Sequence, residues 1–577
     1  MKAIRIFFAS LLALAATVSC TKDFEKINTN PNKITLGEIS ASNCIEPLLY
    51  GIPRSGQNYS WYFGHEMSGM TACTNSGTRQ EHRYNINASN FQSIWDNYAR
   101  YGFDAYHMST LALKEGDTFL EAVGVLLKAY SLNCLTTLYG DIPYREAYQG
   151  ASNVTPAFDS QEEVYKQVVA DIDSAVVRFA RKSSSKGKDL DALYAGNIGK
   201  WIKFANSLRM RTLLYLASIN ESYWAEIQMM VDDPVRFPVF GSNSDNATLF
   251  TKDIDPYKSY FGNGTPTTKS DFQMRRFTEL AVSMLVATDE KFFAVDRDPR
   301  LAVWAQQNKT DQWQGTVGGA ATDECSEAEK RILTYQNFKT MCRADQPMEI
   351  MDYSEILFIE AEGVLRGKLN VGGKTAKELY ESAVRADIEK WAPMVQYNDR
   401  PKAIKPTDID TFLASPLASW DIAEANTEKG NELDALEKEL FNLVQGTSED
   451  NDAIRAKKAE IKAKKAEMNG RYRSVEDLLL SQKWLSLFYV DFQQFNEWRR
   501  NEYPHLVIGN GTVYNAFEYP TRLEYPTYTV STNNANVTGA LNRMGGKNDM
   551  HATLDWSYAK KNAGHRDPYM RHDAFND

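Results

Sequence analysis

The sequence predicts a mainly α-helical protein in which tetratricopeptide-like helix pairs stack and carry an irregular, loop-rich subdomain. Apolar residues recur every three or four positions over six long stretches, as in helices with one buried face. Short connections join several of these stretches, and long aperiodic segments separate others. The pairing is typical of helical repeats, although the sequence signature of the tetratricopeptide repeat is absent.

Six helices are predicted in chain order. The first begins at Phe119 and ends at Gly140, and the second has apolar residues four apart between 164 and 179. Ser160 and Glu163 have the spacing of a capping box at the start of the second helix. The other helices are expected over residues 201–215, 353–366, 376–391 and 475–500.

Residues 432–468 predict a charged helical hairpin that is inserted in this body. Its first arm, 432–444, has leucines three and four apart and is mainly acidic on its other faces. Its second arm, 453–468, is rich in Ala and Lys, with apolar residues seven apart. We therefore expect an antiparallel pair with matched charges. A solvated insertion that binds no partner is the simpler interpretation of its role.

Three aperiodic regions, about 243–270, 306–324 and 503–577, are predicted to form the loop-rich subdomain. Loops of this length in a compact protein are usually functional or disordered. These loops are rich in aromatic residues. We therefore expect ordered, functional loops supported by the helices.

The first residues predict export and a lipid anchor. An apolar run follows Lys2 and Arg5 and is too short to span a membrane, as in a signal peptide. The run ends in TVSC, which resembles a bacterial lipobox with Thr17 in place of the usual Leu. We expect residues 1–19 to be a signal peptide, Cys20 to be lipidated, 20–35 to be a flexible tether and 36–577 to be the globular domain. A plain signal peptide with an incidental cysteine is the alternative.

The lipid anchor and the composition limit where the protein is located and which partners it can bind. Several acyl chains on one cysteine hold a protein durably at a membrane, and no later stretch reaches 18 apolar residues. The net charge of −10 argues against nucleic acid as a partner. Cys325 and Cys342 either form a disulfide or remain buried thiols.

Catalytic motifs are absent from the sequence. There is no nucleophile elbow, no zinc-binding helix, no P-loop and no dinucleotide fingerprint. Glu360 and Glu362 are two apart on a predicted helix and so point to different sides. We expect no enzyme activity, no cofactor and no metal, although a glycosidase pair of carboxylates remains open.

Four stretches together carry a resemblance to a known family: LYGDIPYREA (138–147), DALYAGNIGKWIKFANSLRMRTLLYLA (191–217), YSEILFIEAEGVLRG (353–367) and QKWLSLFYVDFQQFNEWRRNEYPHL (482–506). With CTKDFEKINTNPN after the lipobox, DPRL at 298–301 and YPTRLEYP at 519–526, the chain resembles the SusD/RagB family of Bacteroidetes nutrient-binding lipoproteins. The hairpin at 432–468 and the lack of a Trp-Trp ending depart from the family pattern. The motif residues themselves are expected to be structural.

The resemblance implies a function. Such proteins are binders that sit on the outer membrane, face the cell exterior and cover a SusC-like TonB-dependent transporter. We therefore expect a lipid-anchored protein that captures a glycan and passes it to this transporter. The alternatives are a RagB-type lid that binds peptides and, as a different class, a surface glycoside hydrolase.

The ligand-binding residues are predicted from chemistry, because none of them lies in a family motif. Sugar rings stack on aromatic side chains, and their hydroxyls need polar partners. Three loops combine both kinds of residue, and ordinary packing is the alternative for each ring. The predicted residues are Tyr59, Trp61, Tyr62, Arg79 and Tyr84 in the first loop, Asp255, Tyr257, Tyr260, Phe261 and Asn263 in the second, and Asp311, Trp313 and Gln314 in the third.

Overall fold

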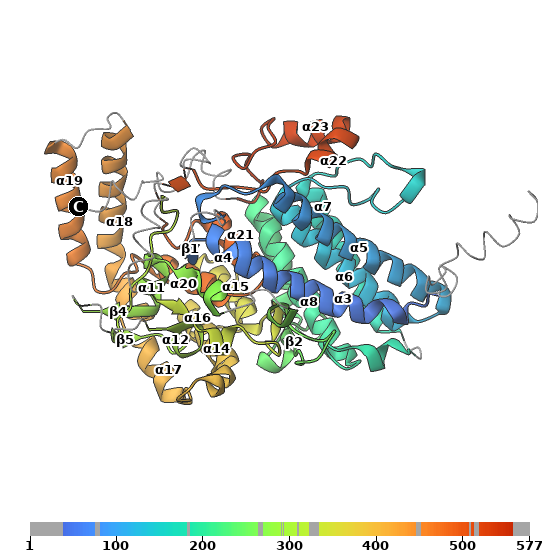
Figure 1. Cartoon of the computed structure of the whole chain (residues 1–577), viewed down its shortest axis with the longest axis horizontal. Coiled ribbons are helices and arrows are strands. Elements are labelled where there is room, and N and C mark those ends of the chain that lie inside the picture. The colour runs from blue at the N-terminus through green and yellow to red at the C-terminus, as the bar shows by residue number, and fades with distance from the viewer. Residues whose placement is uncertain are drawn as a thin grey trace, which may run out of the picture.

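The computed structural model describes residues 39–74, 81–181, 185–263, 269–289, 291, 294–307, 311–321, 334–445, 452–506, 509, 511–512 and 518–557. Cys20, Arg79 and Cys325 lie outside these residues. In the described part, long helices lie side by side and the strands are short (Figure 1). The predicted fold class, mainly α with stacked helix pairs, is confirmed. Cys342 is a free thiol.

Five long helices form the first part of the scaffold. Consecutive helices of the last four pack against each other, and the first packs on the second. Polar N-caps start four of them, because the side chains of Asn87, Asp117, Ser160 and Asn197 accept backbone N–H groups of the first turn. The helices are α3 (Ser42–Tyr59), α5 (Ala88–Glu115), α6 (Thr118–Tyr139), α7 (Gln161–Phe179) and α8 (Ile198–Ile219).

Helix α6 is the apolar centre of this group. The sequence predicts no membrane-spanning stretch after the signal peptide. By length and composition alone, α6 could cross a membrane. However, 83% of its apolar window is buried inside the protein. The contacts of α6 with α5 and α7 identify it as a core helix. Gly140, with φ of +91°, ends the helix as predicted.

The start of α7 differs in one detail from the prediction. Ser160 Oγ accepts a hydrogen bond from Glu163 N at 3.5 Å, which is the first half of a capping box. The Glu163 carboxylate instead accepts from Lys166 Nζ at 3.1 Å. The Glu163 carboxylate is therefore paired with Lys166, one turn further on, and not with the backbone N–H of Ser160 that a complete capping box requires.

Three helices form a second group with its own apolar cluster. Helix α15 (Tyr353–Leu365) packs on α16 (Ala376–Trp391) and α20 (Val475–Ser486). A complete capping box of Thr375 and Glu378 starts α16. The predicted bounds of α16 are confirmed, and α15 ends one residue early.

The predicted helix over 475–500 is wrong as a single element. The structure breaks it into α20 and α21 (Gln493–Asn501). In the break, Tyr489 and Asp491 have φ of +65° and +46°, which a helix does not allow. Tertiary hydrogen bonds hold this conformation: Tyr489 N donates to His65 Nε2 at 3.2 Å, and Ser60 Oγ donates to the Asp491 carbonyl at 2.6 Å.

A buried ion network joins α15, α20 and α21. Arg500 Nη1 donates to Glu362 Oε1 at 2.7 Å, and Lys483 Nζ lies 3.1 Å from Glu497 Oε2. All four side chains are almost fully buried. Except for Lys483, these charges come from the FIEAE and FNEWRR segments, and their partners agree with the structural role that the sequence predicts for them. Glu360 is only half-buried, on another side of α15.

The charged hairpin is confirmed as a structure. Helices α18 (Trp420–Gln445) and α19 (Asp452–Ala466) stand side by side and rise away from the other helices (Figure 1). Leu433, Leu440, Ile454 and Ile461 form its apolar seam. Lysines of α19 lie within 2.7–2.9 Å of carboxylates of α18, in the pairs Lys457–Glu439, Lys464–Glu432 and Lys465–Glu437. The first arm is longer than predicted.

The loop-rich region lies mainly between α8 and α15, and its first strand comes earlier in the chain, before α5. Its strands form three small antiparallel sheets, in the orders β1-β3-β7-β6, β2-β8 and β4-β5. The strands are β1 (Thr71–Cys73), β2 (Ala247–Leu249), β3 (Arg275–Phe277), β4 (Val286–Thr288), β5 (Ala294–Arg297), β6 (Ala305–Gln306), β7 (Tyr335–Gln336) and β8 (Met348–Met351).

Short helices complete the fold. Two of them lie within 503–577, which the sequence predicts as loop. The remaining α-helices of the described residues are α4 (His65–Met67), α9 (Trp224–Asp232), α10 (Lys269–Gln273), α11 (Glu279–Leu285), α12 (Leu301–Trp304), α14 (Phe338–Met341), α17 (Pro406–Leu413), α22 (Thr527–Thr532) and α23 (Asn534–Arg543). Ser60–Gly64 form a π-helical turn, and short 3₁₀ helices lie at Glu81–Arg83, Gly150–Ser152, Gly187–Leu190, Glu221–Tyr223, Asn243–Asp245, Tyr260–Asn263 and Ala392–Tyr397.

Candidate ligand-binding site

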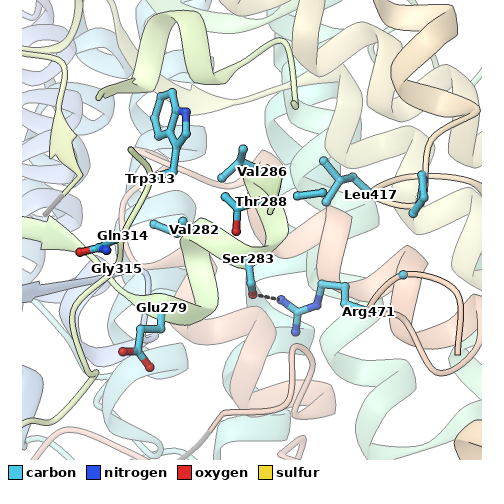
Figure 2. A pocket seen from close by; sticks show the side chains of 13 residues that line it. Glu279, Val282, Ser283, Val286, Thr288, Trp313, Gln314, Gly315, Leu417 and Arg471 are labelled. Carbon is cyan, nitrogen blue, oxygen red and sulfur yellow. Dashed lines mark hydrogen bonds between the residues drawn. The ribbon is translucent and has the colours of Figure 1, made fainter. Parts of the chain in front are cut away.

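Two cavities lie beside α11. The larger one has a volume of about 590 Å³, in the range of small-molecule sites. Three parts of the chain surround it: α11 with β4, the loop 313–315, and the base of the α18–α19 hairpin (Figure 2). The smaller cavity has a volume of about 320 Å³ and lies between α11, the segment 317–319 and the chain at 505–506.

The N-cap residue Thr278 fixes the start of α11. Its Oγ1 accepts a hydrogen bond from Ala281 N at 3.1 Å and donates to the carbonyl of Gly69 at 2.6 Å. The loop 313–315 runs directly against this start. A Cβ at Gly315 would lie 2.2 Å from Glu279 N, so only glycine allows the loop to come this close.

The hairpin base forms the opposite wall of the larger cavity. Asn426 Nδ2 donates to the carbonyls of Asn469 at 2.8 Å and Tyr472 at 3.0 Å, which ties the two ends of the hairpin together. Between them, Arg471 Nη1 donates to Ser283 Oγ at 3.0 Å (Figure 2). The hairpin base and α11 are therefore linked across the edge of the cavity.

The lining of the larger cavity is mixed. Val282, Val286 and Leu417 supply apolar surface, and Trp313 supplies an aromatic ring. Trp313 is 5% exposed, and its Nε1 has no hydrogen-bond partner among the described residues. The polar lining consists of Glu279, Ser283, Thr288, Gln314 and Arg471. An aromatic ring next to several polar groups is the combination that a sugar requires.

Two aromatic rings line the smaller cavity. Tyr84 and Tyr519 meet edge to face with their centroids 5.7 Å apart. Tyr84 has a φ of +60°, a strained backbone conformation for a tyrosine. His505 and Leu506 contribute to the rim.

Glu66, which lines the smaller cavity, belongs to a buried ion pair. Glu66 Oε1 lies 2.7 Å from Arg275 Nε, and Glu66 Oε2 accepts a hydrogen bond from His82 N at 3.0 Å. Burial raises the pKa of Glu66, and the charge of Arg275 opposes this shift. Burial and the neighbouring Arg83 and Arg275 lower the pKa of His82 to about 3, so its imidazole is neutral at physiological pH. Among the described residues, no group of three or more His, Cys, Asp or Glu is placed to hold a metal ion.

The predicted ligand residues fall into separate places. Trp313 and Gln314 line the larger cavity and Tyr84 the smaller one, so the structure brings the end of the first predicted loop and the third loop to the same region. Asp311 lies on the same loop as Trp313 and is exposed. Arg79 lies outside the described residues, as does the side chain of Asn263.

The remaining predicted rings do not line either cavity. Trp61 is 2% exposed; it stacks on Phe272 at 6.2 Å, and the guanidinium of Arg275 lies 4.2 Å from its ring. Tyr62, Tyr260 and Phe261 surround it. Tyr59 is buried against Phe492, and Tyr257 packs on Tyr50, beside the exposed Asp255. Ligand contact by these residues stays a prediction, and packing explains their observed positions.

Sequence reasoning missed several lining residues. Arg471 follows the hairpin in a segment without periodicity, and only the fold brings it to Ser283. Tyr519 begins the motif YPTRLEYP, which was assigned a structural role. Glu66 and His82 carry no metal-binding or catalytic spacing. No local signal in the sequence connects these four positions.

The scaffold and the cavities define a helical-repeat protein with two loop-lined cavities. Residues 31–439 and 451–526 match the SusD-like family, described as starch-binding and associating with the outer membrane, and the chain belongs to this family. The family resemblance seen in the sequence is confirmed. The match is interrupted inside the hairpin, between residues 439 and 451. No curated protein matches the chain.

Solved structures share this fold. A SusD homolog from Parabacteroides distasonis is 17% identical with a TM-score of 0.68, and the alignment covers 92% of this chain and 99% of the homolog. A chitin-binding SusD homolog from Flavobacterium johnsoniae is 20% identical with a TM-score of 0.63, covering 89% and 98%. At these identities the similarity extends to the fold.

Proposed function

We propose that the protein captures an oligosaccharide or polysaccharide at the outer membrane in the cavity beside α11, without cleaving it. The observation that carries this proposal is the cavity of about 590 Å³, whose lining includes Trp313, Glu279, Gln314 and Arg471. The ring supplies a stacking surface, and the polar groups supply partners for hydroxyls. The family description as starch-binding supports a glycan as the ligand class.

The cavity lining favours binding over hydrolysis. A glycosidase of the common type needs two carboxyl groups about 5–10 Å apart on either side of the scissile bond. Among the described residues that line the larger cavity, only Glu279 has a carboxylate. In the smaller cavity the second carboxylate, Glu66, is held by Arg275 and by a backbone N–H. Neither arrangement supplies a free acid and base pair.

A binding panel with a turnover assay tests the proposal. The purified protein without its lipid is incubated with polysaccharides, oligosaccharides and a peptide library, and both retention and product release are measured. We expect at least one glycan to bind and no product to form at enzymatic rates. Binding of peptides alone would identify a RagB-type lid, and steady release of sugar products would identify a hydrolase.

We further propose that Cys20 is lipidated and anchors the protein on the outer face of the outer membrane. Two or three acyl chains on one residue supply the necessary hydrophobic free energy, at about 0.8 kcal/mol for each buried CH₂ group. Palmitate labelling of cells tests this. The label should disappear in Cys20→Ala, while Cys44→Ala, which removes a cysteine of the globular part, should keep it.

The proposed partner is a SusC-like TonB-dependent transporter that takes up the captured glycan. A permanent complex usually buries about 2,000 Å² or more, with an apolar centre. Helix α5 exposes Phe103, Tyr106 and Leu113 on one face at 46%, 41% and 64%, which supports docking through the stacked helices. Copurification from membranes tests this: replacing Phe103 and Leu113 by Ser should release the transporter, and Val295→Ser, at a site 74% exposed elsewhere, should not.

A further inference from the structure

The two cavities share part of their lining. Glu279 and Ser283 border both of them. Because these residues are four apart on α11, they lie above one another on the same face of the helix. Val282 and Val286 flank this pair on the side of the larger cavity, and Leu280 flanks it on the side of the smaller one. The pair thus forms a ridge, and one cavity lies on each side of it.

The ridge is polar and the two sides are aromatic. It carries the Glu279 carboxylate and the Ser283 hydroxyl, which accepts the hydrogen bond from Arg471. Trp313 lines the cavity on one side, and Tyr84 with Tyr519 lines the cavity on the other. Ser283 itself is exposed, so the ridge is accessible from solvent.

A ligand that contacts both cavities and the ridge must have apolar, polar and again apolar surfaces along its length. A helix with its side chains is about 10–12 Å wide, more than a single sugar ring can span. A linear chain of sugar units meets the requirement, because each unit has an apolar face for stacking and the hydroxyls between stacked units need polar partners. Two unrelated small ligands would leave the polar ridge without a function.

We propose that the two cavities form one site for a linear oligosaccharide, which crosses the ridge of α11 with one sugar unit against Trp313 and another against the tyrosine pair. This inference rests on the proposed function and adds the smaller cavity as a second subsite, which only a chain of several sugar units can reach from the larger cavity. The larger cavity alone holds the short ligands. The smaller cavity contributes only when the chain is long enough to cross the ridge.

Affinity as a function of chain length tests the proposal. Calorimetry is carried out with a series from one to about eight units of a glycan that binds in the panel. We expect the affinity to rise with length and then reach a plateau. In Val317→Trp, which fills the smaller cavity only, short chains should keep their affinity and long chains should fall by about tenfold.

Two further variants make the outcome decisive. Gly318→Leu also enters the smaller cavity, and a Cβ there meets only Thr278 Cγ2, at the ordinary distance of 3.6 Å, so the fold should accept it. Thr288→Trp fills the larger cavity and should weaken chains of every length. Circular dichroism confirms that each variant is folded.

The possible failures are distinct. If Val317→Trp and Gly318→Leu change no affinity, or change short and long chains equally, the two-cavity site is wrong. The proposed function would survive that result as long as glycans bind and Thr288→Trp weakens them. If no glycan of any length binds the wild-type protein, the proposed function itself fails.

Discussion

The surroundings of Trp61 and of Trp313 look alike in sequence and differ in the structure. Both tryptophans lie in segments with Tyr, Phe, Asp or Gln neighbours, both are at most 5% exposed, and neither indole N–H has a hydrogen-bond partner among the described residues. Trp61 is covered by Phe272 and Arg275, whereas Trp313 forms the wall of a cavity. The exposed fraction alone therefore does not separate a packed ring from a ring that lines a cavity. Their neighbours do.

The largest expected effect is on stability at Trp61. Trp61→Ala removes a buried aromatic ring and leaves a cavity beside Arg275, which costs about 3–5 kcal/mol of unfolding free energy. Denaturant unfolding measures this loss. Phe250→Ala, at an exposed ring, is the matched control and should stay within about 0.5 kcal/mol of the wild type. A stable Trp61→Ala protein that no longer binds glycan would show that this ring contacts the ligand after all.

The same contrast between scaffold and site holds for two buried carboxylates. In the scaffold, Arg500, Arg366 and Lys483 outweigh the effect of burial and hold the pKa of Glu362 well below its ordinary value. At the smaller cavity, burial outweighs Arg275 and raises the pKa of Glu66. Their contributions to stability therefore change with pH in opposite directions.

Glu362→Gln should be destabilising by about 3–5 kcal/mol at neutral pH, because Arg500 and Lys483 lose a buried charged partner. A lowered pKa means that the contribution of Glu362 is present above its ordinary pKa and is lost as the pH falls through the folded-state value. The deficit of the variant should therefore shrink only in strong acid. Urea unfolding from neutral to acidic pH measures it, and an equal deficit at every pH would contradict the assignment.

Glu66→Gln is expected to show the opposite trend with a smaller amplitude. A raised pKa means that the folded protein favours the protonated carboxyl, so this contribution is full below the ordinary pKa and is lost as the pH rises through the folded-state value. The wild type should therefore lose stability relative to the Gln variant with rising pH, by up to about 1.4 kcal/mol per pH unit. A difference that is independent of pH would mean that Arg275 keeps Glu66 charged.

At Trp313 the expected effect is on affinity rather than stability. Trp313→Ala removes the stacking surface of the larger cavity and should weaken glycan binding by about 1–3 kcal/mol, if the ring is a hot spot of the interface. Calorimetry with the glycan found in the panel measures this. Phe250→Ala serves as the control again. Unchanged affinity in a folded Trp313→Ala protein would place the ligand elsewhere.

The helices could be predicted further than the site. Periodicity and caps define α16 completely, since Thr375, Glu378 and the apolar face are all local. The break between α20 and α21 could not be predicted, because the left-handed Tyr489 and Asp491 depend on contacts with His65 and Ser60, more than 400 residues away. The cavity beside α11 likewise depends on contacts between residues that are far apart in the sequence.

Single residues show why the cavity was only partly foreseen. Trp313 was predicted because its own loop combines an aromatic ring with polar neighbours. Arg471 was not, because its position beside Ser283 is set by the Asn426 contacts at the hairpin base. Local sequence thus indicates the ring but not the walls that long-range packing brings to it.

The smallest expected effect concerns the hairpin, whose two halves differ in their relation to the site. Its base lines the cavity through Arg471, whereas the outer arms have an apolar seam and ion pairs of their own. Replacing residues 432–468 by a short Gly-Ser linker keeps Asn426, Asn469 and Arg471. Arg473 loses Asp434 and Glu437 as partners but gains water, so the base should remain folded.

Glycan affinity and copurification with the transporter should therefore stay within about twofold of the wild type, because charged arms are poorly suited to the centre of an interface. Calorimetry and copurification from membranes measure the two properties. Arg471→Ala is the matched control, since it keeps the arms, removes the guanidinium from the cavity wall and should lower affinity. If the deletion releases the transporter from an otherwise folded protein, the arms are a docking element. If the deletion lowers glycan affinity as much as Arg471→Ala does, the arms are needed to hold the cavity wall in place.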